Sequence, residues 1–199
     1  MTHSSPYQPY AWDEDLTISP SGKKADIKDA KAYGASTARG IAQAKGLGQP
    51  FFLSINISDP HKPFWSQVRG GGEDPYKPSR IFTAEEVPVP GFLFEDEAVR
   101  EELALYYSSV RRADDCLNQV LLALKKSGEW DNTMIVFLSD HGMPLPFAKT
   151  QLYHHSTRTP LMVRIPGVTK AGSVDKRHMV SVLDLLPTVM DALGVKKPA

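Results

Sequence analysis

The sequence lacks several features that would place it quickly in a protein class. It has one cysteine among 199 residues, so no disulfide can form within the chain. Lys plus Arg and Asp plus Glu number 23 each, and this neutral balance gives no electrostatic signature of nucleic-acid binding. No apolar run is long enough to span a bilayer. Met1 to Pro6 do not resemble a signal peptide. What remains is a length that suits one sizeable core or part of a larger domain.

The most informative segment that is present runs from Met134 to Gly142. An apolar, β-branched stretch over residues 134–138 stops at Ser139-Asp140-His141-Gly142. The stretch predicts a buried strand of a parallel sheet, and ligands of open α/β sheets bind at the carboxyl ends of such strands. Carboxylates and imidazoles are metal ligands, and Gly142 lets the chain turn away without a side chain in the way. The segment therefore indicates a metal-assisted enzyme.

Two further strands are expected, at Phe51–Ile57 and Leu161–Ile165, and the first of them leads to Asp59-Pro60-His61. If Phe51–Ile57 and residues 134–138 share one parallel sheet, His61 lies at the same sheet edge as Asp140 and His141. An isolated Asp or His after a strand is often a plain turn residue. The coincidence at two equivalent strand ends favours a site.

Helical periodicity gives the rest of the organisation. Helices are expected over residues 26–45, 99–124 and 181–193, the last beginning or kinking at Pro187. Residues 1–26 have no clear period, and residues 62–96 predict a long loop. We therefore expect an α/β sandwich over residues 27–199, preceded by an irregular segment.

Three other features bear on the chemistry. Lys149, in the Pro-rich loop after Asp140, suits a tetrahedral oxyanion such as sulfate or phosphate, although a solvated surface lysine is the alternative. His154 and His155 either line a pocket or belong to an exposed loop. Cys116 lies within a helical pattern and is expected to be a small core residue.

Several short motifs occur in order over roughly residues 48–195. They are Pro50-Phe51-Phe52-Leu53-Ser54, Asp59-Pro60-His61, Asn132-Thr133, Ser139-Asp140-His141-Gly142, Lys149-Thr150-Gln151-Leu152-Tyr153, Thr159-Pro160-Leu161 and Leu183-Asp184-Leu185-Leu186-Pro187-Thr188. In their order and spacing these motifs resemble the sulfatase family of the alkaline-phosphatase-like superfamily. The segment after Gly142 is especially similar to the heparan N-sulfatase (sulfamidase) branch.

The resemblance implies a fold and a set of roles. The fold would be an alkaline-phosphatase-like α/β sandwich with a largely parallel central sheet, incomplete in this chain. Asp140 and His141 would bind a divalent metal, usually Ca²⁺ in sulfatases. Lys149 would hold a sulfate oxygen, and His61 would hydrogen-bond the sulfate or protonate the leaving atom. The substrate would be a sulfated sugar or a related small sulfate, and the location periplasmic, secreted or lysosomal.

The family's nucleophile, a formylglycine made in a Cys/Ser-x-Pro-x-Arg motif, is the part that the chain does not show. Tyr76–Arg80 has the tail of that motif but carries Tyr at its first position, and we interpret it as loop. We expect a partial sulfatase domain with little or no activity alone and an exposed sheet edge.

Two alternatives to a sulfatase stay open. One is a phosphonate monoester or phosphodiester hydrolase of the same superfamily, which His141 favours because imidazole suits Mn²⁺ or Zn²⁺. The other is a non-catalytic module with the sulfatase fold.

Overall fold

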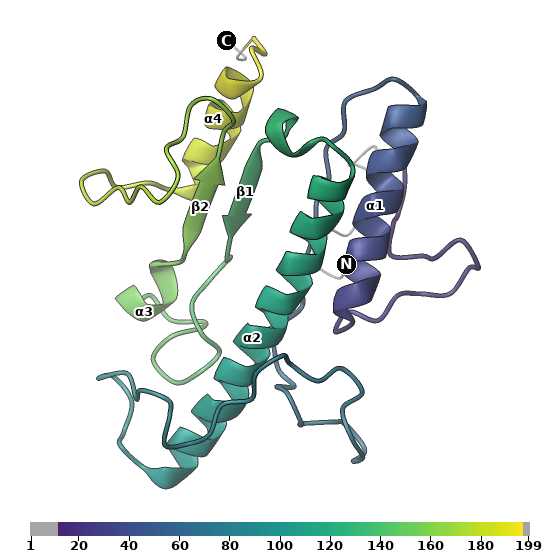
Figure 1. Ribbon diagram of the computed structural model, residues 1–199. Helices are drawn as coiled ribbons and strands as arrows, with labels where there is room; N and C mark the ends of the chain where they lie inside the picture. Colours follow the sequence, from purple (N-terminus) through teal and green to yellow (C-terminus); the bar gives the residue numbers. More distant parts are fainter. Residues whose placement is uncertain (1–11, 197–199) are drawn as a thin grey trace. The chain divides into compact units, whose positions relative to one another are not determined.

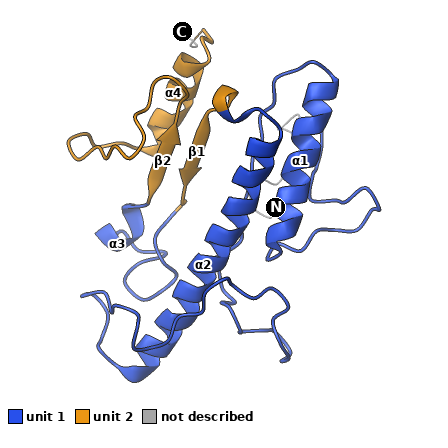
Figure 2. Cartoon of the chain, in the orientation of Figure 1, with its two compact units in different colours: residues 1–130, 141–159 blue, residues 131–140, 160–199 orange. Residues whose placement is uncertain are grey.

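The computed structural model describes residues 12–196, and the path of the chain is shown in Figure 1. The chain divides into two units, which Figure 2 distinguishes by colour. Unit 1 comprises residues 1–130 and 141–159, and unit 2 comprises residues 131–140 and 160–199.

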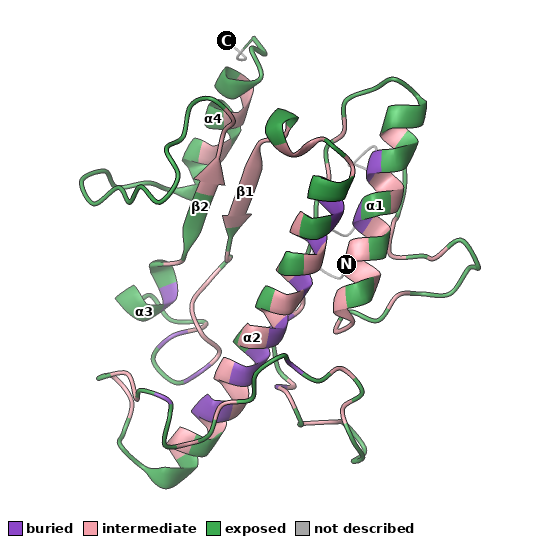
Figure 3. Cartoon of the chain, in the orientation of Figure 1, coloured by how far each residue is buried: buried purple, intermediate pink, exposed green. Residues whose placement is uncertain are grey.

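Two packed helices, α1 (Ala30–Gly46) and α2 (Glu97–Lys126), form the frame of unit 1. Both begin at an aspartate, because the Asp29 and Asp96 carboxylates accept hydrogen bonds from backbone N–H groups that have no partner within the helix. These helices confirm the predictions for residues 26–45 and 99–124. Figure 3 shows that α2 buries one stripe along its length. The buried residues of that stripe are Leu103, Ala104, Ser108, Ser109, Arg112, Cys116, Val120, Ala123 and Leu124.

The apolar core of unit 1 joins α2 to two loops. Leu103 and Ala104 of α2 pack with Val87, from the predicted long loop, and with Leu145, from the loop after Gly142. Residues 62–96 contain no helix or strand, so the loop prediction is confirmed. Burial of a Leu or Val side chain stabilises a fold by about 1.5–3 kcal/mol. The cluster therefore holds both loops on α2.

The predicted strand at Phe51–Ile57 is wrong in the structure. The segment pairs with no strand among residues 12–196. Phe52 is 78% exposed and stacks on Trp12, with ring centroids 5.9 Å apart. The apolar pattern predicted a buried strand, but a strand needs a hydrogen-bonding neighbour, which the described residues do not supply.

Unit 2 contains β1 (Ile135–Leu138) and β2 (Leu161–Arg164). They form a two-stranded antiparallel sheet in which Val136 pairs with Val163. Strands at both places are confirmed, but a buried, parallel arrangement is wrong for this pair. No residue of either strand is fully buried, because two short strands cannot cover their own faces.

The remaining elements are short. The 3₁₀ helices η1 (Trp130–Asn132) and η2 (Val182–Asp184) precede β1 and α4, and α3 (His154–Thr157) follows the loop after Gly142. Helix α4 (Leu185–Ala192) carries Pro187 in its first turn, where a missing N–H costs nothing, so the predicted helix start at Pro187 is confirmed to within two residues. Within the predicted irregular segment, residues 12–26 hold an isolated bridge between Ile18 and Lys24, and residues 1–11 lie outside the described part.

Candidate functional site

The Asp140-His141-Gly142 turn follows β1 directly, as predicted. The backbone N–H of Ser139 donates to the Pro160 carbonyl at 3.4 Å, and Asp140, which is exposed, is the last residue of this part of unit 2. His141 and Gly142 are half-buried and belong to unit 1.

The ring of His141 is oriented by its own backbone. Its Nδ1 lies 2.7 Å from the Gly142 carbonyl oxygen, which can only accept, so Nδ1 carries the proton and Nε2 the lone pair of the neutral ring. Metal-bound histidines usually donate their second ring N–H to a carbonyl in this way. The tautomer of His141 therefore suits a ligand.

Gly142 is required for a different reason than the one predicted. Its N–H donates to the Ser156 carbonyl at 2.9 Å, which brings α3 against it. A Cβ at this position would lie 1.9 Å from the His155 carbonyl oxygen. The residue is therefore glycine because another backbone approaches it, rather than because the chain must turn away.

Lys149 sits in a loop that is anchored by the residues before it. Its N–H donates to the Met143 carbonyl at 3.1 Å, Ala148 is fully buried, and Leu145 belongs to the core of unit 1. Lys149 is half-buried, and its side chain makes no hydrogen bond or ion pair with residues 12–196. A partly desolvated cation on a fixed loop suits an oxyanion.

His61 is positioned by contacts between its loop and α2 rather than by the end of a strand. Asp59 is 6% exposed, and its carboxylate accepts from Arg112 of α2 at 2.5 Å and from Lys28. His61 itself is exposed, and its Nδ1 lies 2.6 Å from the Lys62 carbonyl oxygen. The prediction that His61 follows a paired strand is therefore wrong.

Arg112 is the residue that sequence reasoning missed. It is 2% exposed, and its Nη1 also donates to Asp74 at 2.6 Å and to the Tyr76 carbonyl at 3.0 Å. Burial lowers the pKa of Arg112, but hydrogen bonds to Asp59 and Asp74 outweigh it and the pKa is raised.

The remaining residues singled out in the sequence are Cys116, His154, His155 and the Tyr76–Arg80 segment. Cys116 is fully buried, and burial raises the pKa of its thiol to about 12, so the predicted core role is confirmed. His154 and His155 are both exposed, and the His155 ring stacks on Phe92 with ring centroids 3.8 Å apart. Within Tyr76–Arg80, Ser79 donates to Asp115 at 2.6 Å, which fits the loop interpretation.

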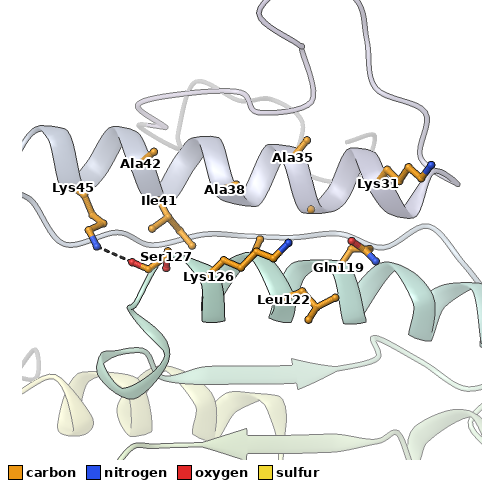
Figure 4. Close-up of a pocket in the computed structure, with 12 residues that line it drawn as sticks. Lys31, Ala35, Ala38, Ile41, Ala42, Lys45, Gln119, Leu122, Lys126 and Ser127 are labelled. Carbon is orange, nitrogen blue, oxygen red and sulfur yellow. Dashed lines mark hydrogen bonds between the residues drawn. The ribbon is translucent and has the colours of Figure 1, made fainter.

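A groove of about 610 Å³ lies between α1 and α2 (Figure 4). Its wall includes Ala38, Ile41 and Leu122, and Lys45 at its end donates to the Ser127 carbonyl at 2.8 Å. None of the predicted site residues lines it. The groove is therefore separate from the predicted catalytic residues.

The fold class follows from a structural comparison. The chain resembles the phosphonate monoester hydrolase SpPMH from Silicibacter pomeroyi, with a TM-score of 0.54 and 22% sequence identity over 99% of this chain and 48% of that chain. The chain therefore shares the α/β fold of that structure, which is the fold class that the sequence predicted. Strands at the expected places are part of it, although the described residues contain no parallel pair.

The family is shown by sequence. The Sulfatase family model matches residues 4–195, and the chain belongs to the sulfatase family of hydrolases. Human N-sulphoglucosamine sulphohydrolase is 33% identical over 164 residues, which cover 76% of this chain and 33% of that protein. Arylsulfatase K of Danio rerio is 29% identical, covering 91% of this chain and 40% of that protein. The PehA protein of Trinickia caryophylli, a multifunctional alkaline phosphatase superfamily protein, is 26% identical over 92% of this chain and 41% of its own length.

The chain thus spans well under half the length of these relatives. No helix within residues 12–196 has the length and apolar character needed to cross a membrane.

Proposed function

We propose that the chain supplies part of the site of a sulfatase-type hydrolase that cleaves a sulfuric ester or N-sulfate of a sugar or related small molecule. Lys149 would bind a sulfate oxygen and stabilise the charge that develops there in the transition state. His61 would hydrogen-bond the sulfate or protonate the leaving oxygen or nitrogen. Similarity to a sulphoglucosamine sulphohydrolase supports a sulfated sugar as substrate.

The observation that carries this proposal is the state of Lys149. A lysine without a polar partner among the described residues is ordinary when its side chain is solvated. Lys149 instead is half-buried on a loop fixed by Leu145 and Ala148, and the loop follows the Asp140-His141-Gly142 motif. An anion is the kind of ligand that suits a partly desolvated cation in this position.

A divalent metal and a formylglycine are general features of the superfamily. Asp140 and His141 have the right donor chemistry for a metal, and the His141 tautomer suits one. However, residues 12–196 contain no group of three His, Cys, Asp or Glu side chains that could hold an ion. Two donors do not complete a coordination shell, so we propose Asp140 and His141 as contributors to a site and derive no catalytic step from the metal.

The binding test uses inorganic sulfate and needs no nucleophile. We expect sulfate to shift the NMR signals of the Lys149 loop, and Lys149→Met to weaken binding about tenfold, which corresponds to about 1.4 kcal/mol. Lys77→Met is the matched control, because Lys77 is an exposed lysine of the same unit. Equal weakening by both substitutions would show that sulfate responds to net charge and would refute the site.

Activity is tested separately with an aryl sulfate. We expect little or no turnover by this chain, because it contains no Cys/Ser-x-Pro-x-Arg motif. Turnover above that of a His61→Ala, Lys149→Ala double variant would contradict this expectation. A sulfatase-like module without catalytic function would bind sulfate and still show no turnover in any longer form of the protein.

Hydrolysis of a phosphonate monoester or phosphodiester is the second candidate, and His141 favours it. An imidazole ligand suits Mn²⁺ or Zn²⁺ better than Ca²⁺. Elemental analysis of protein purified without added metal separates the candidates: Ca²⁺ supports the sulfatase, and Mn²⁺ or Zn²⁺ supports the phospho-enzyme.

A further inference from the structure

A cluster of four charges lies buried beneath the loop that carries His61. The Asp59 side chain is 1% exposed and is held by Arg112, at 3%, and by Lys28, at 15%. Asp74 pairs with the other side of Arg112 at 2.6 Å, so the two cations and two carboxylates balance. Buried charges are costly unless paired, and replacing them with apolar residues is often neutral or stabilising. Stability alone therefore does not account for the cluster.

The cluster fixes the main chain at His61. Asp59 is tied to α2 by two hydrogen bonds from Arg112, at 2.5 and 3.3 Å. Lys28 bridges the Asp59 carboxylate and the carbonyl oxygen of His61, the latter at 3.3 Å. Beyond His61, the N–H of Trp65 donates to Ser109 of α2 at 2.6 Å. The segment 59–65 is therefore held to one helix on both sides of the histidine.

The orientation of the His61 ring depends on this main chain. Nδ1 lies 2.6 Å from the Lys62 carbonyl oxygen, so Nδ1 is the protonated atom of the neutral ring and Nε2 has the lone pair. The Lys62 side chain is held in turn by an ion pair with Glu102 of α2. If the main chain of residues 61–62 moves, the carbonyl leaves the ring and both tautomers become accessible.

We propose that Lys28, Asp59 and Arg112 are positioning residues that hold His61 as the Nδ1–H tautomer, with Nε2 as the atom that faces the substrate. This rests on the proposed role of His61. A proton taken up at Nε2 gives an imidazolium whose Nδ1–H stays bonded to the carbonyl. Transfer of that proton from Nε2 to the leaving oxygen or nitrogen returns the ring to the neutral Nδ1–H form. The reacting nitrogen is thus the same in every turnover.

The test reads the tautomer directly, by long-range ¹H–¹⁵N NMR of the chain at a pH where the ring is neutral, with His61→Gln to assign the signal. We expect the Nδ1–H form in the unsubstituted chain. Lys28→Met should raise the Nε2–H form from a trace to a population comparable with the Nδ1–H form. Lys28→Arg should restore the original pattern. Lys28→Met keeps the pairing of Asp59 with Arg112, so the chain should fold, and near-UV circular dichroism checks that it does.

Asp59→Asn provides a second, stronger perturbation, and Arg80→Met is the control because Arg80 forms an exposed ion pair with Glu86. A purely structural role predicts that Lys28→Met and Asp59→Asn lower stability while the His61 tautomer stays unchanged, and that outcome overturns the proposal. The measurement uses no substrate. Failure of sulfate to bind at Lys149 would therefore refute the proposed function without altering this result.

Discussion

Replacing Gly142 by alanine tests the close approach of two backbone segments after the Asp140-His141 pair. The new Cβ would lie 1.9 Å from the His155 carbonyl oxygen and 3.0 Å from the Ser156 Cα. Reaching even a 3.0 Å separation requires the carbonyl to move by about 1.1 Å. Because the neighbour is main chain, no side-chain rotation relieves the clash, and the hydrogen bond from Gly142 to Ser156 must lengthen or break.

Two terms set the size of the effect. Overpacking costs about 1–3 kcal/mol and a lost hydrogen bond about 0.5–1.5 kcal/mol, so we expect Gly142→Ala to lower the free energy of unfolding by about 1.5–4.5 kcal/mol. All three tryptophans lie within residues 1–130 of unit 1, so urea unfolding followed by tryptophan fluorescence reports on the unit that contains Gly142. Faster hydrogen exchange at residue 142 gives a local readout.

Gly91→Ala is the matched control for this experiment. Gly91 lies in a loop of the same unit, has no positive φ, and has no atom within 4 Å of an added Cβ. Alanine there should stabilise the protein slightly, by about 0.4–1 kcal/mol, through the unfolded state. If Gly142→Ala changes the free energy of unfolding no more than Gly91→Ala does, the proposed close approach does not exist in solution.

Three further predictions concern buried and terminal groups. The Cys116 thiol should stay unreactive towards a disulfide reagent in the native protein and react fully in urea, because it is fully buried with a pKa raised to about 12; rapid native labelling would contradict this. Burial raises the pKa of both Cys116 and Tyr33 to about 12, from 9.0 and 10.0, so their contribution to stability is complete below pH 9 and is lost as the pH rises towards 12. Denaturation measured across that pH range should therefore show a smaller loss of stability for Cys116→Ala than for the unsubstituted chain. Equal losses in the two proteins would refute the raised pKa of Cys116. Asp96→Ala should lower the free energy of unfolding by about 1 kcal/mol, because the N-cap of α2 is lost. Urea unfolding measures this effect, with Asp114→Ala at an exposed position as the control. Equal effects of the two substitutions would count against the N-cap.

The sequence predicted the helices well because their signals are local. The stripe of α2 has a regular period, and its N-cap aspartate and the glycine after it lie within a few residues of its ends. Strand pairing is not a local property. The apolar runs at Phe51–Ile57 and Ile135–Leu138 look alike in sequence, yet the second has an antiparallel partner and the first has none among the described residues.

The residues of the candidate site show the same difference between local and non-local signals. His61, Lys149, Asp140 and His141 were found from their places after apolar runs and from family motifs, and their roles remain predictions. Arg112 was missed because its partners, Asp59 and Asp74, are 53 and 38 residues away in sequence. The reason for Gly142 was misread because the contact comes from α3 rather than from the turn itself.

Helix α2 holds both loops that carry proposed catalytic residues: Leu103 and Ala104 contact the Lys149 loop through Leu145, and Arg112 holds the His61 loop. Leu103 and Arg112 are separated by about 14 Å along the helix at 1.5 Å per residue. The helix therefore fixes the distance between the residues that hold the two loops. One residue inserted between Leu103 and Arg112 would rotate one of them by about 100° about the helix axis relative to the other. Insertions in either loop would leave the spacing of these two residues unchanged.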